Sequence, residues 1–180
     1  MKKRIIVLII IFLVFVFSIL GYFYVKDVVF PNKYTDYINQ YSQEYGVEPL
    51  LVKGVIRTES DYNPSATSNM NAKGLMQITD STGEWIAGKV GVKNFTPEML
   101  YNPKINIQFG CWYLKNLESE FHNKNNAIAA YNAGRTNVKK WLENKDYSKD
   151  GQNLYNIPFT QTSNYVKRVN LYEKAYYYLH

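Results

Sequence analysis

A single carboxylate, Glu59, stands near the end of the stretch "LLVKGVIRTES", residues 50–60, whose spacing of apolar residues predicts a helix. If Val55 is set at 0° and each residue adds about 100°, Ile56 falls at about 100° and Glu59 at about 40°. Glu59 therefore lies within the apolar stripe of this helix. A charge placed there is costly unless it is neutralised, paired or used.

Two interpretations of Glu59 follow. In the first, the helix ends here and the acid contacts solvent or a neighbouring backbone amide. In the second, the acid lies in a partly apolar cleft, where desolvation raises its pKa and keeps it protonated near neutral pH. Such an acid can protonate the oxygen of a leaving group. The nearest second acid, Asp61, lies about 200° round the same helix, so we expect it to face solvent or cap a turn.

Other catalytic chemistries have little support in the sequence. The two histidines, His122 and His180, are far apart, and no Cys-x-x-Cys or His-x-x-x-His spacing occurs, so we expect neither a metal site nor a cofactor. The single cysteine, Cys111, lies between large apolar residues in "NIQFGCWYLKNL" and is predicted to be a buried free thiol. A peptidase that uses Cys111 with His122 would need an exposed thiolate, which this setting does not favour.

The N-terminus begins with "MKKRIIVLIIIFLVFVFSILGYFYV", in which three basic residues precede an uncharged run from Ile5 to Val25. About 20 apolar residues suffice to cross a bilayer. The run is longer than the core of a cleavable signal peptide and has no A-x-A-like cut site, so we interpret residues 1–25 as an uncleaved anchor. The positive-inside rule then places a short N-terminal tip in the cytoplasm and the remaining chain outside the cell membrane, facing the wall.

The net charge of +6 includes three basic residues at positions 2–4, whereas all 15 acids lie beyond them. The remaining excess is mild and gives no reason to expect nucleic acid as a partner. After a linker at residues 26–35, residues 36–180 are long enough for one domain with a hydrophobic core. We expect this domain to be a monomer.

The chain outside the anchor reads as helices joined by short polar segments, without alternation long enough for a sheet. Apolar spacing predicts a helix over residues 34–45 that ends at Gly46, and another that starts at Pro49. Further helices are predicted around the segments "TPEML", 105–121, "NNAIAAYNAG", "NVKKWLE" and "SNYVKRVNLYEKAYYYL". The fold class is therefore all-α.

Four segments carry a resemblance to a known family: "ESDYNPSATSNMNAKGLMQIT" from Glu59, "YNPKINIQFGCWYLKNL", "AIAAYNAGRTNVKKW" and "NIPFTQTSNYVKRV". Their order and spacing resemble the lytic transglycosylase domain of the soluble lytic transglycosylase type, in the lysozyme-like superfamily. The resemblance covers about residues 36–178. Each motif alone is weak, whereas Glu-Ser, Gly-Leu-Met-Gln and Ala-Tyr-Asn-Ala-Gly together are specific.

The resemblance implies a compact lysozyme-like domain that acts on peptidoglycan glycan strands. It implies that Glu59 is the single catalytic acid and base on the β-1,4 bond between N-acetylmuramic acid and N-acetylglucosamine. Family members protonate the glycosidic oxygen and then take a proton from the muramyl 6-hydroxyl, which closes on C1 to give a 1,6-anhydro sugar. The attacking oxygen belongs to the substrate, so no second carboxylate is needed to activate water.

The resemblance also implies a substrate-binding set, namely Ser68, Met76, Gln77, Tyr131 and Asn132. Each residue can also be explained by local structure or packing alone. Ser68 can be ordinary loop chemistry, Gln77 a loop amide beside a core methionine, Tyr131 core packing, and Asn132 the turn into Gly134. Tyr131 matches a family tyrosine whose hydroxyl approaches the catalytic acid, so the resemblance implies the same for Tyr131.

The sequence departs from the family pattern at several positions. Gln161 and Ser163 replace a glutamate and an arginine, Asp80 and Ser81 stand where a proline is common, and Asn102 replaces a frequent aspartate. These changes leave the fine specificity open. Two alternative functions also stay open: hydrolysis of the same bond, as in g-type lysozymes, and a wall-binding or assembly module that has lost activity.

Overall fold

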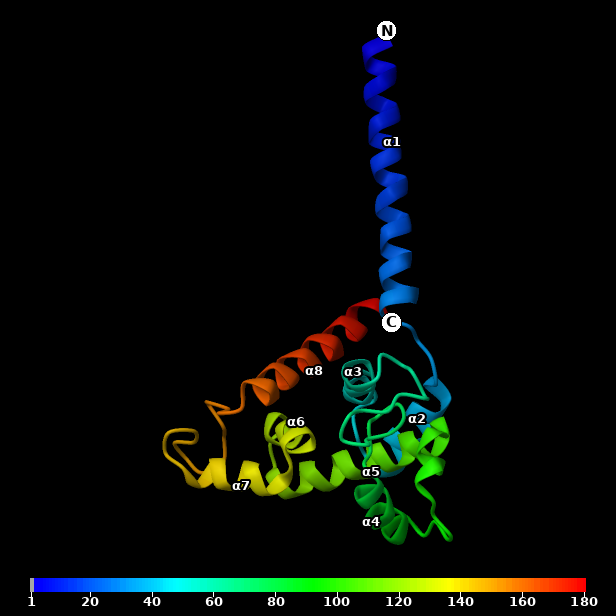
Figure 1. Cartoon of the computed structure of the whole chain (residues 1–180). Coiled ribbons are helices and arrows are strands. Elements are labelled where there is room, and N and C mark those ends of the chain that lie inside the picture. The colour runs from blue at the N-terminus through cyan, green and yellow to red at the C-terminus, as the bar shows by residue number, and fades with distance from the viewer. Residues whose placement is uncertain (1) are drawn as a thin grey trace.

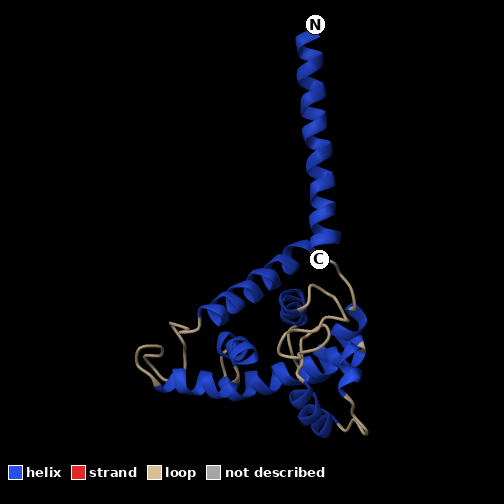
Figure 2. Ribbon diagram, viewed as in Figure 1, coloured by secondary structure: helices blue, strands red, loops and turns tan. Residues whose placement is uncertain are grey.

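The computed structural model describes residues 2–180, so Met1 of the expected anchor lies outside the described residues. Within this range the regular elements are helices, and extended pairing is limited to two isolated antiparallel bridges near Lys73. The all-α prediction is confirmed (Figure 2). In chain order the elements are α1 (Lys2–Phe23), a π-helical turn (Tyr24–Val29), α2 (Thr35–Tyr45), α3 (Pro49–Glu59), α4 (Asp80–Val90), a 3-10 helix (Pro97–Tyr101), α5 (Pro103–Phe121), α6 (Lys124–Ala133), α7 (Arg135–Glu143) and α8 (Thr160–Leu179).

Helix α1 projects away from the other helices as a single rod (Figure 1). The helical segment Lys3–Val29 is long and apolar enough to cross a membrane, and its apolar window has no part buried inside the structure. The expected linker, residues 26–35, is helical as far as Val29, because α1 continues into the π-helical turn. Residues 30–34 then lead into α2.

The predicted end of α2 and the predicted start of α3 are confirmed, while α2 begins one residue later than predicted, at Thr35. Helix α2 ends at Gly46, whose φ of 69° is a left-handed conformation that suits glycine. Helix α3 starts at Pro49, where a missing N–H leaves no hydrogen bond unmade. The helices predicted around residues 105–121, 125–134, 137–143 and 163–179 are also present. The "TPEML" segment is a 3-10 helix instead of an α-helix, and it leads into α5 through Asn102.

Helix α4 was missed by the sequence analysis. Two glycines and three hydroxyl residues between positions 79 and 88 weaken its helical pattern. The end signals were nevertheless present. Thr79 caps the first turn by accepting from the Thr82 amide, and Gly91 ends the helix with a φ of 78°. Asp80, one of the departures from the family pattern, is the first residue of α4. Its negative charge interacts favourably with the positive end of the helix dipole.

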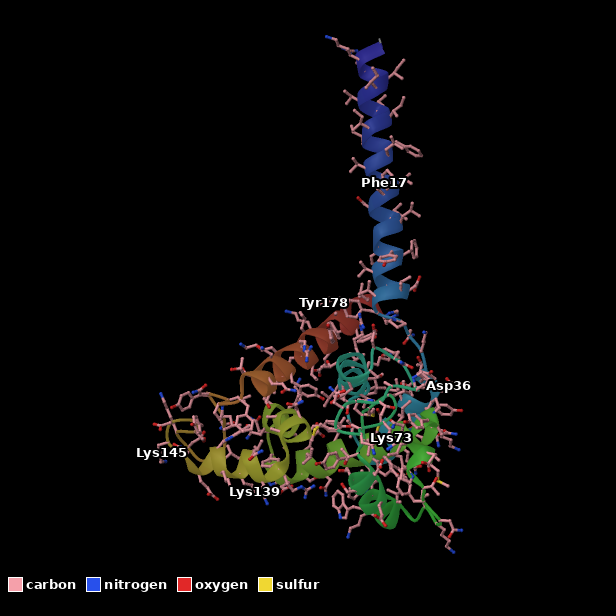
Figure 3. All side chains as sticks on the ribbon, in the orientation of Figure 1. Phe17, Asp36, Lys73, Lys139, Lys145 and Tyr178 are labelled. Atoms are coloured by element: carbon pink, nitrogen blue, oxygen red, sulfur yellow. The ribbon has the colours of Figure 1, made fainter. Side chains whose placement is uncertain are left out.

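The core is built mainly from buried side chains of α3, α5, α6 and α8. Helix α3 contacts α8, and α5 contacts both α2 and α6 (Figure 1). Fully buried side chains include Val55, Ile56 and Phe109, and side chains from every helix except α1 fill the space between the ribbons (Figure 3). Cys111 is buried in this core as predicted, and burial raises the pKa of its thiol to about 12.

The pairing of α3 with α8 depends on Gly54. A Cβ atom at Gly54 would lie 2.8 Å from the carbonyl oxygen of Val169 and 3.1 Å from the amide nitrogen of Glu173. Only glycine therefore lets the two backbones approach this closely. Because Glu59 is five residues further along α3, this contact also sets how near the acid lies to α8.

Candidate active site

Glu59 is the last residue of α3, and its side chain is half-buried. The chain reverses immediately afterwards, since Asp61 and Tyr62 both have left-handed φ values, 52° and 60°. Tyr62 turns back into the core, whereas Asp61 is exposed and pairs with Arg57 one helical turn earlier. The prediction that Asp61 faces solvent is confirmed, and Glu59 is left as the carboxylate directed at α8.

The hydrogen-bond partner of Glu59 is Tyr165, in the second turn of α8. The Tyr165 hydroxyl donates to Glu59 Oε1 at 2.6 Å, and Tyr165 is only 2% exposed. Desolvation by burial raises the pKa of Glu59 to about 7, while the hydrogen bond from Tyr165 and the positive charge of Arg168 act in the opposite direction. The acid can therefore hold a proton near neutral pH and release it. The raised pKa favours the second interpretation of Glu59, an acid in partly apolar surroundings.

Tyr131 lies close to this pair without bonding to it. Burial and then the nearby charge of Glu59 raise the pKa of Tyr131 well above its ordinary value. Its hydroxyl, however, donates to the backbone carbonyl of Met76 at 2.8 Å. In this structure the tyrosine hydroxyl that reaches the acid is that of Tyr165, whereas the hydroxyl of Tyr131 bonds to the Gly-Leu-Met-Gln segment.

The Gly-Leu-Met-Gln segment, residues 74–77, is held in place by backbone geometry. A Cβ atom at Gly74 would lie 2.2 Å from the Leu100 carbonyl oxygen, and the φ of Gly74 is 75°, so this position requires glycine. Gln77 adopts a left-handed φ of 48°, and its side-chain amide donates to the carbonyls of Gly74 at 2.9 Å and Ala66 at 3.2 Å. The side chain of Met76 is fully buried.

Asn106 on α5 is a buried residue that fastens this segment. Its Oδ1 accepts from the Met76 amide at 2.7 Å, and its Nδ2 donates to the carbonyls of Lys73 at 2.9 Å and Leu100 at 2.7 Å. From the other side, the Ser60 hydroxyl donates to the Leu75 carbonyl at 2.8 Å. Glu59 and residues 74–77 are therefore joined through its immediate neighbour Ser60.

The other two predicted residues form no hydrogen bond with Glu59 or Tyr165. Ser68 is exposed, and its hydroxyl oxygen accepts from the amides of Met70 and Ala72 at 3.3 and 3.1 Å, which shapes the loop. Asn132 is half-buried, and its Oδ1 accepts from the Thr162 hydroxyl at 2.9 Å. This last bond joins α6 to the first turn of α8, close to Tyr165.

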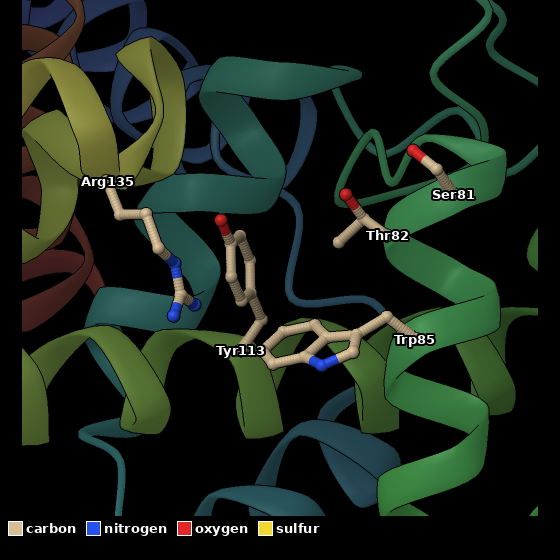
Figure 4. Close-up of a pocket in the computed structure, with 5 residues that line it drawn as sticks. All are labelled: Ser81, Thr82, Trp85, Tyr113 and Arg135. Atoms are coloured by element: carbon tan, nitrogen blue, oxygen red, sulfur yellow. The ribbon is translucent and has the colours of Figure 1, made fainter.

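A pocket of about 400 Å³ lies beside this centre, between α4, α5 and α7 (Figure 4). Its floor is aromatic: the rings of Trp85 and Tyr113 meet edge to face with centroids 6.1 Å apart, and Trp85 is 38% exposed. The guanidinium of Arg135 lies 5.1 Å from the Trp85 ring. The hydroxyls of Ser81 and Thr82 stand on the α4 side, as Figure 4 shows.

The pocket connects to the acid through aromatic rings. The Tyr113 ring centroid lies 5.3 Å from that of Tyr131, which in turn lies near Glu59. Arg135 is fixed by the side chains of Asn116, at 2.8 Å, and Glu120, at 3.2 Å. An exposed indole beside hydroxyl and guanidinium donors is suited to a sugar ring, whose apolar face can stack while its hydroxyls form hydrogen bonds.

Sequence reasoning missed Tyr165, Asn106 and the aromatic pocket. Tyr165 stands in the "NYV" part of a motif that was recognised, but no local pattern says that its hydroxyl meets an acid 106 positions away. Asn106 is a polar residue on the buried face of α5, and this was a usable signal, because buried amides need partners. The pocket depends on α4, which was not predicted.

Two of the departures from the family pattern have structural roles. Asp80 accepts from Asn71 at 2.8 Å and forms an ion pair with Lys73, which is buried. Asn102 caps α5 by accepting from the amides of Lys104 and Ile105. Gln161 is exposed and Ser163 half-buried at the start of α8. Among residues 2–180, no group of three His, Cys, Asp or Glu side chains is placed to hold a metal ion.

Comparison with known proteins places this arrangement in a family. Residues 36–154 match the transglycosylase SLT domain. The soluble lytic murein transglycosylase of Salmonella typhimurium is 34% identical over 151 residues, which cover 82% of this chain and 23% of that protein. A membrane-bound lytic murein transglycosylase C of Actinobacillus pleuropneumoniae is 31% identical over 172 residues, covering 82% of this chain and 47% of that protein.

Solved structures of two lytic transglycosylases have a similar fold. The lytic transglycosylase Slt of Pseudomonas aeruginosa has a TM-score of 0.74 and 29% identity, over 83% of this chain and 25% of that one. The 70 kDa soluble lytic transglycosylase of Escherichia coli has a TM-score of 0.73 and 30% identity over the same shares. The chain belongs to the transglycosylase SLT domain family. It spans about a quarter of the length of the soluble relatives that it matches.

Proposed function

We propose that this protein is a membrane-anchored lytic transglycosylase that cleaves peptidoglycan glycan strands between N-acetylmuramic acid and N-acetylglucosamine. The observation that carries the proposal is the half-buried Glu59, whose pKa is raised to about 7 beside the hydroxyl of Tyr165. Relatives over four fifths of the chain are named as lytic murein transglycosylases. The Pseudomonas structure is that of an inactive variant in which a glutamate is replaced by glutamine.

The chemistry needs one carboxyl group that first gives and then takes a proton. Protonated Glu59 donates to the glycosidic oxygen while the bond from C1 to that oxygen breaks. The resulting carboxylate then removes the proton of the muramyl 6-hydroxyl as that oxygen bonds to C1. The product is a 1,6-anhydro end, and Glu59 is protonated again. Between the two steps the Tyr165 hydroxyl stabilises the carboxylate through their hydrogen bond.

The substrate-binding roles follow from where the side chains lie. Ser68 is exposed on the loop after the acid, and Gln77 and Asn132 are half-buried, so each has surface that a glycan can reach. Met76 is fully buried, and we assign it a role through its backbone carbonyl, which accepts from Tyr131. The pocket around Trp85 extends the site away from the acid and is proposed to hold a further sugar.

The membrane part of the proposal rests on α1. Membrane association is suggested by the apolar segment Lys3–Val29 and by the membrane-bound relatives. We propose one membrane pass by residues 1–25, with the basic residues at positions 2–4 on the cytoplasmic side and residues 36–180 as one extracytoplasmic, monomeric domain facing the wall. Residues 26–35 connect the two parts.

The test is analysis of products from purified peptidoglycan by mass spectrometry. We expect 1,6-anhydro ends from the wild-type chain and a rate about 10²- to 10⁴-fold lower for Glu59→Gln. Glu143→Gln, at an exposed position on α7, is the matched control and should retain the wild-type rate. Reducing ends without anhydro sugars would establish hydrolysis instead. Equal, negligible cleavage by wild type and Glu59→Gln would establish a binding module.

A further inference from the structure

The C-terminal end of α8 holds the segment that follows α1. The His180 Nε2 lies 2.8 Å from the carbonyl oxygen of Phe30 and 3.2 Å from that of Lys26. The Tyr176 hydroxyl donates to the Pro31 carbonyl at 3.3 Å, and the Phe30 ring packs edge to face on Tyr176 with centroids 5.4 Å apart. The chain between α1 and α2 is therefore fastened to the domain over Lys26–Pro31.

This attachment lies at the expected height of a membrane surface. A hydrocarbon core of about 30 Å corresponds to about 20 helical residues. Counted from Ile5, the first apolar residue, such a span ends near Tyr24. Tyr22 and Tyr24 are exposed there, as is typical of the aromatic residues that flank membrane spans. Lys26, which His180 contacts through its carbonyl, is therefore at the level of the lipid headgroups.

Beside this level, the last three turns of α8 expose large side chains to the surroundings. Leu171 is 61% exposed, Tyr177 and Tyr178 are each 70% exposed, and Lys174 is exposed between them. We call these four residues the α8 tip. Figure 3 labels Tyr178 next to the base of α1, and Figure 1 shows the C-terminus at the same place.

The charges around the α8 tip favour a lipid surface. Lys174 belongs to the tip, and Lys167 and Arg168 are exposed two turns earlier on α8. Of the two acids that line a hollow with Lys174 and Tyr177, Glu173 forms an ion pair with Lys124 at 2.8 Å and Glu48 is exposed. Asp27 is the exposed acid on the adjoining π-helical turn. Tyrosine and lysine with an exposed leucine are the combination that interfacial helices present to headgroups.

We propose that the α8 tip is a membrane-docking surface, which rests among the outer lipid headgroups around the point where α1 leaves the bilayer. The proposal rests on the membrane anchoring by α1 put forward above, but not on the enzymatic activity. Its consequence is that the domain is held against the membrane and does not swing on a free tether. Tyr165 is 13 residues from Tyr178, or about 20 Å along the helix. Glu59 is thereby held at a short, fixed distance from the headgroups.

The experiment measures how close the α8 tip comes to lipid in the full chain reconstituted in phosphatidylcholine vesicles. Tyr178→Cys and Lys145→Cys are each labelled with a fluorophore, and a headgroup-nitroxide lipid serves as quencher. The native Cys111 is buried, with a pKa raised to about 12, and stays unlabelled. Lys145 is exposed on the far side of the domain (Figure 3) and is the matched control.

We expect quenching to be several-fold stronger at position 178 than at position 145. Adding Leu171→Ser and Tyr177→Ser to the labelled Tyr178→Cys chain should reduce the difference, and replacing part of the neutral lipid by phosphatidylglycerol should increase it. Equal quenching at both positions in a chain that stays with the membrane on alkaline extraction would overturn the docking while leaving the anchor intact. Release of the chain by that extraction would overturn both.

A protein partner on the α8 tip would give a different result. If a second copy covered the tip, energy transfer between labelled chains would be seen at high protein content. Headgroup quenching at position 178 would then rise as the chains are diluted in lipid and the copies separate. Quenching that does not change on dilution supports lipid as the occupant, whereas dilution-dependent quenching contradicts it.

Discussion

The two ends of α8 carry the same residue type in opposite surroundings. Near its N-terminus Tyr165 is 2% exposed and donates to Glu59, whereas at its C-terminus Tyr177 and Tyr178 are each 70% exposed. Helix α8 packs against α3 and α6, and its C-terminal end lies near the base of α1 (Figure 1). A tyrosine thus bonds to an acid at one end and is exposed at the other, where we propose that it meets lipid. Whether a tyrosine of α8 is buried or exposed depends on which parts of the helix other elements cover.

The two ends are also mechanically connected. Gly54 brings α3 against the middle of α8, at Val169 and Glu173, so this contact reaches from the side of Tyr165 into the stretch that carries the α8 tip. Arg57 on α3 lies 5.5 Å from the Tyr172 ring, so the same pair of helices supports both the acid and the segment that follows α1. A change at one end that leaves the other unaffected would show that they act separately.

The largest expected effect concerns the N-terminal end, where burial raises the pKa of Glu59 from 4.5 to about 7. The contribution of Glu59 to the free energy of unfolding is fully present below about pH 4.5 and is lost as the pH rises through 7. The reason is that the Glu59 carboxyl loses its proton at a lower pH in the unfolded chain than in the folded chain. Relative to wild type, Glu59→Gln should therefore gain about 3 kcal/mol in free energy of unfolding between about pH 4 and pH 8. Urea unfolding in detergent micelles measures this. A difference that does not change with pH would show that Glu59 is solvated.

The next effect concerns the contact in the middle of the helix pair. Gly54→Ala should lower the free energy of unfolding by about 1 to 3 kcal/mol, because the added Cβ meets the backbone of α8. The matched control is Gly88→Ala in α4, where a Cβ would have no atom within 4 Å. That substitution should stabilise the chain by about 0.5 to 1 kcal/mol. Similar changes in both variants would contradict the close approach of α3 and α8.

A smaller effect is expected from the hydroxyl of Tyr165. Tyr165→Phe removes a donor that lowers the pKa of Glu59, so the alkaline limb of the pH–rate profile should move to higher pH. The rate near neutral pH should fall about tenfold, the value of one hydrogen bond to a charged group. Tyr131→Phe, which loses only the bond to Met76, should lower the rate without moving the limb. If both variants moved the limb equally, Tyr165 would have no special role.

The smallest effect is expected at the C-terminal end. Tyr178→Ser should change the rate on soluble glycan fragments by less than about twofold, because the exposed side chain contributes little to stability and lies away from the acid. Initial rates on purified fragments in detergent would check this. A loss as large as that of Tyr165→Phe would mean that the two ends of α8 are coupled.

Much of the fold could be read from the sequence because its signals are local. Gly46 and Pro49 mark helix ends by their own backbone preferences, and the apolar run from Ile5 to Val25 identifies α1 by composition. Helix α4 was missed because its local signal is weak. Its glycines weaken the helical pattern, and the packing that stabilises the helix involves α5 and the 3-10 helix. That packing is not visible in residues 80–90 alone.

The sequence by itself determined that one acid lies on an apolar stripe, that the chain is helical, and which motifs surround Glu59. The tertiary structure alone decided that Tyr165 meets the acid, that Asn106 holds residues 74–77, and that the C-terminus returns to the base of α1. The physical reason is one of range. Helix periodicity and capping act within a few residues, whereas a buried hydrogen bond can pair any two groups that the packing of helices brings within 3 Å or so.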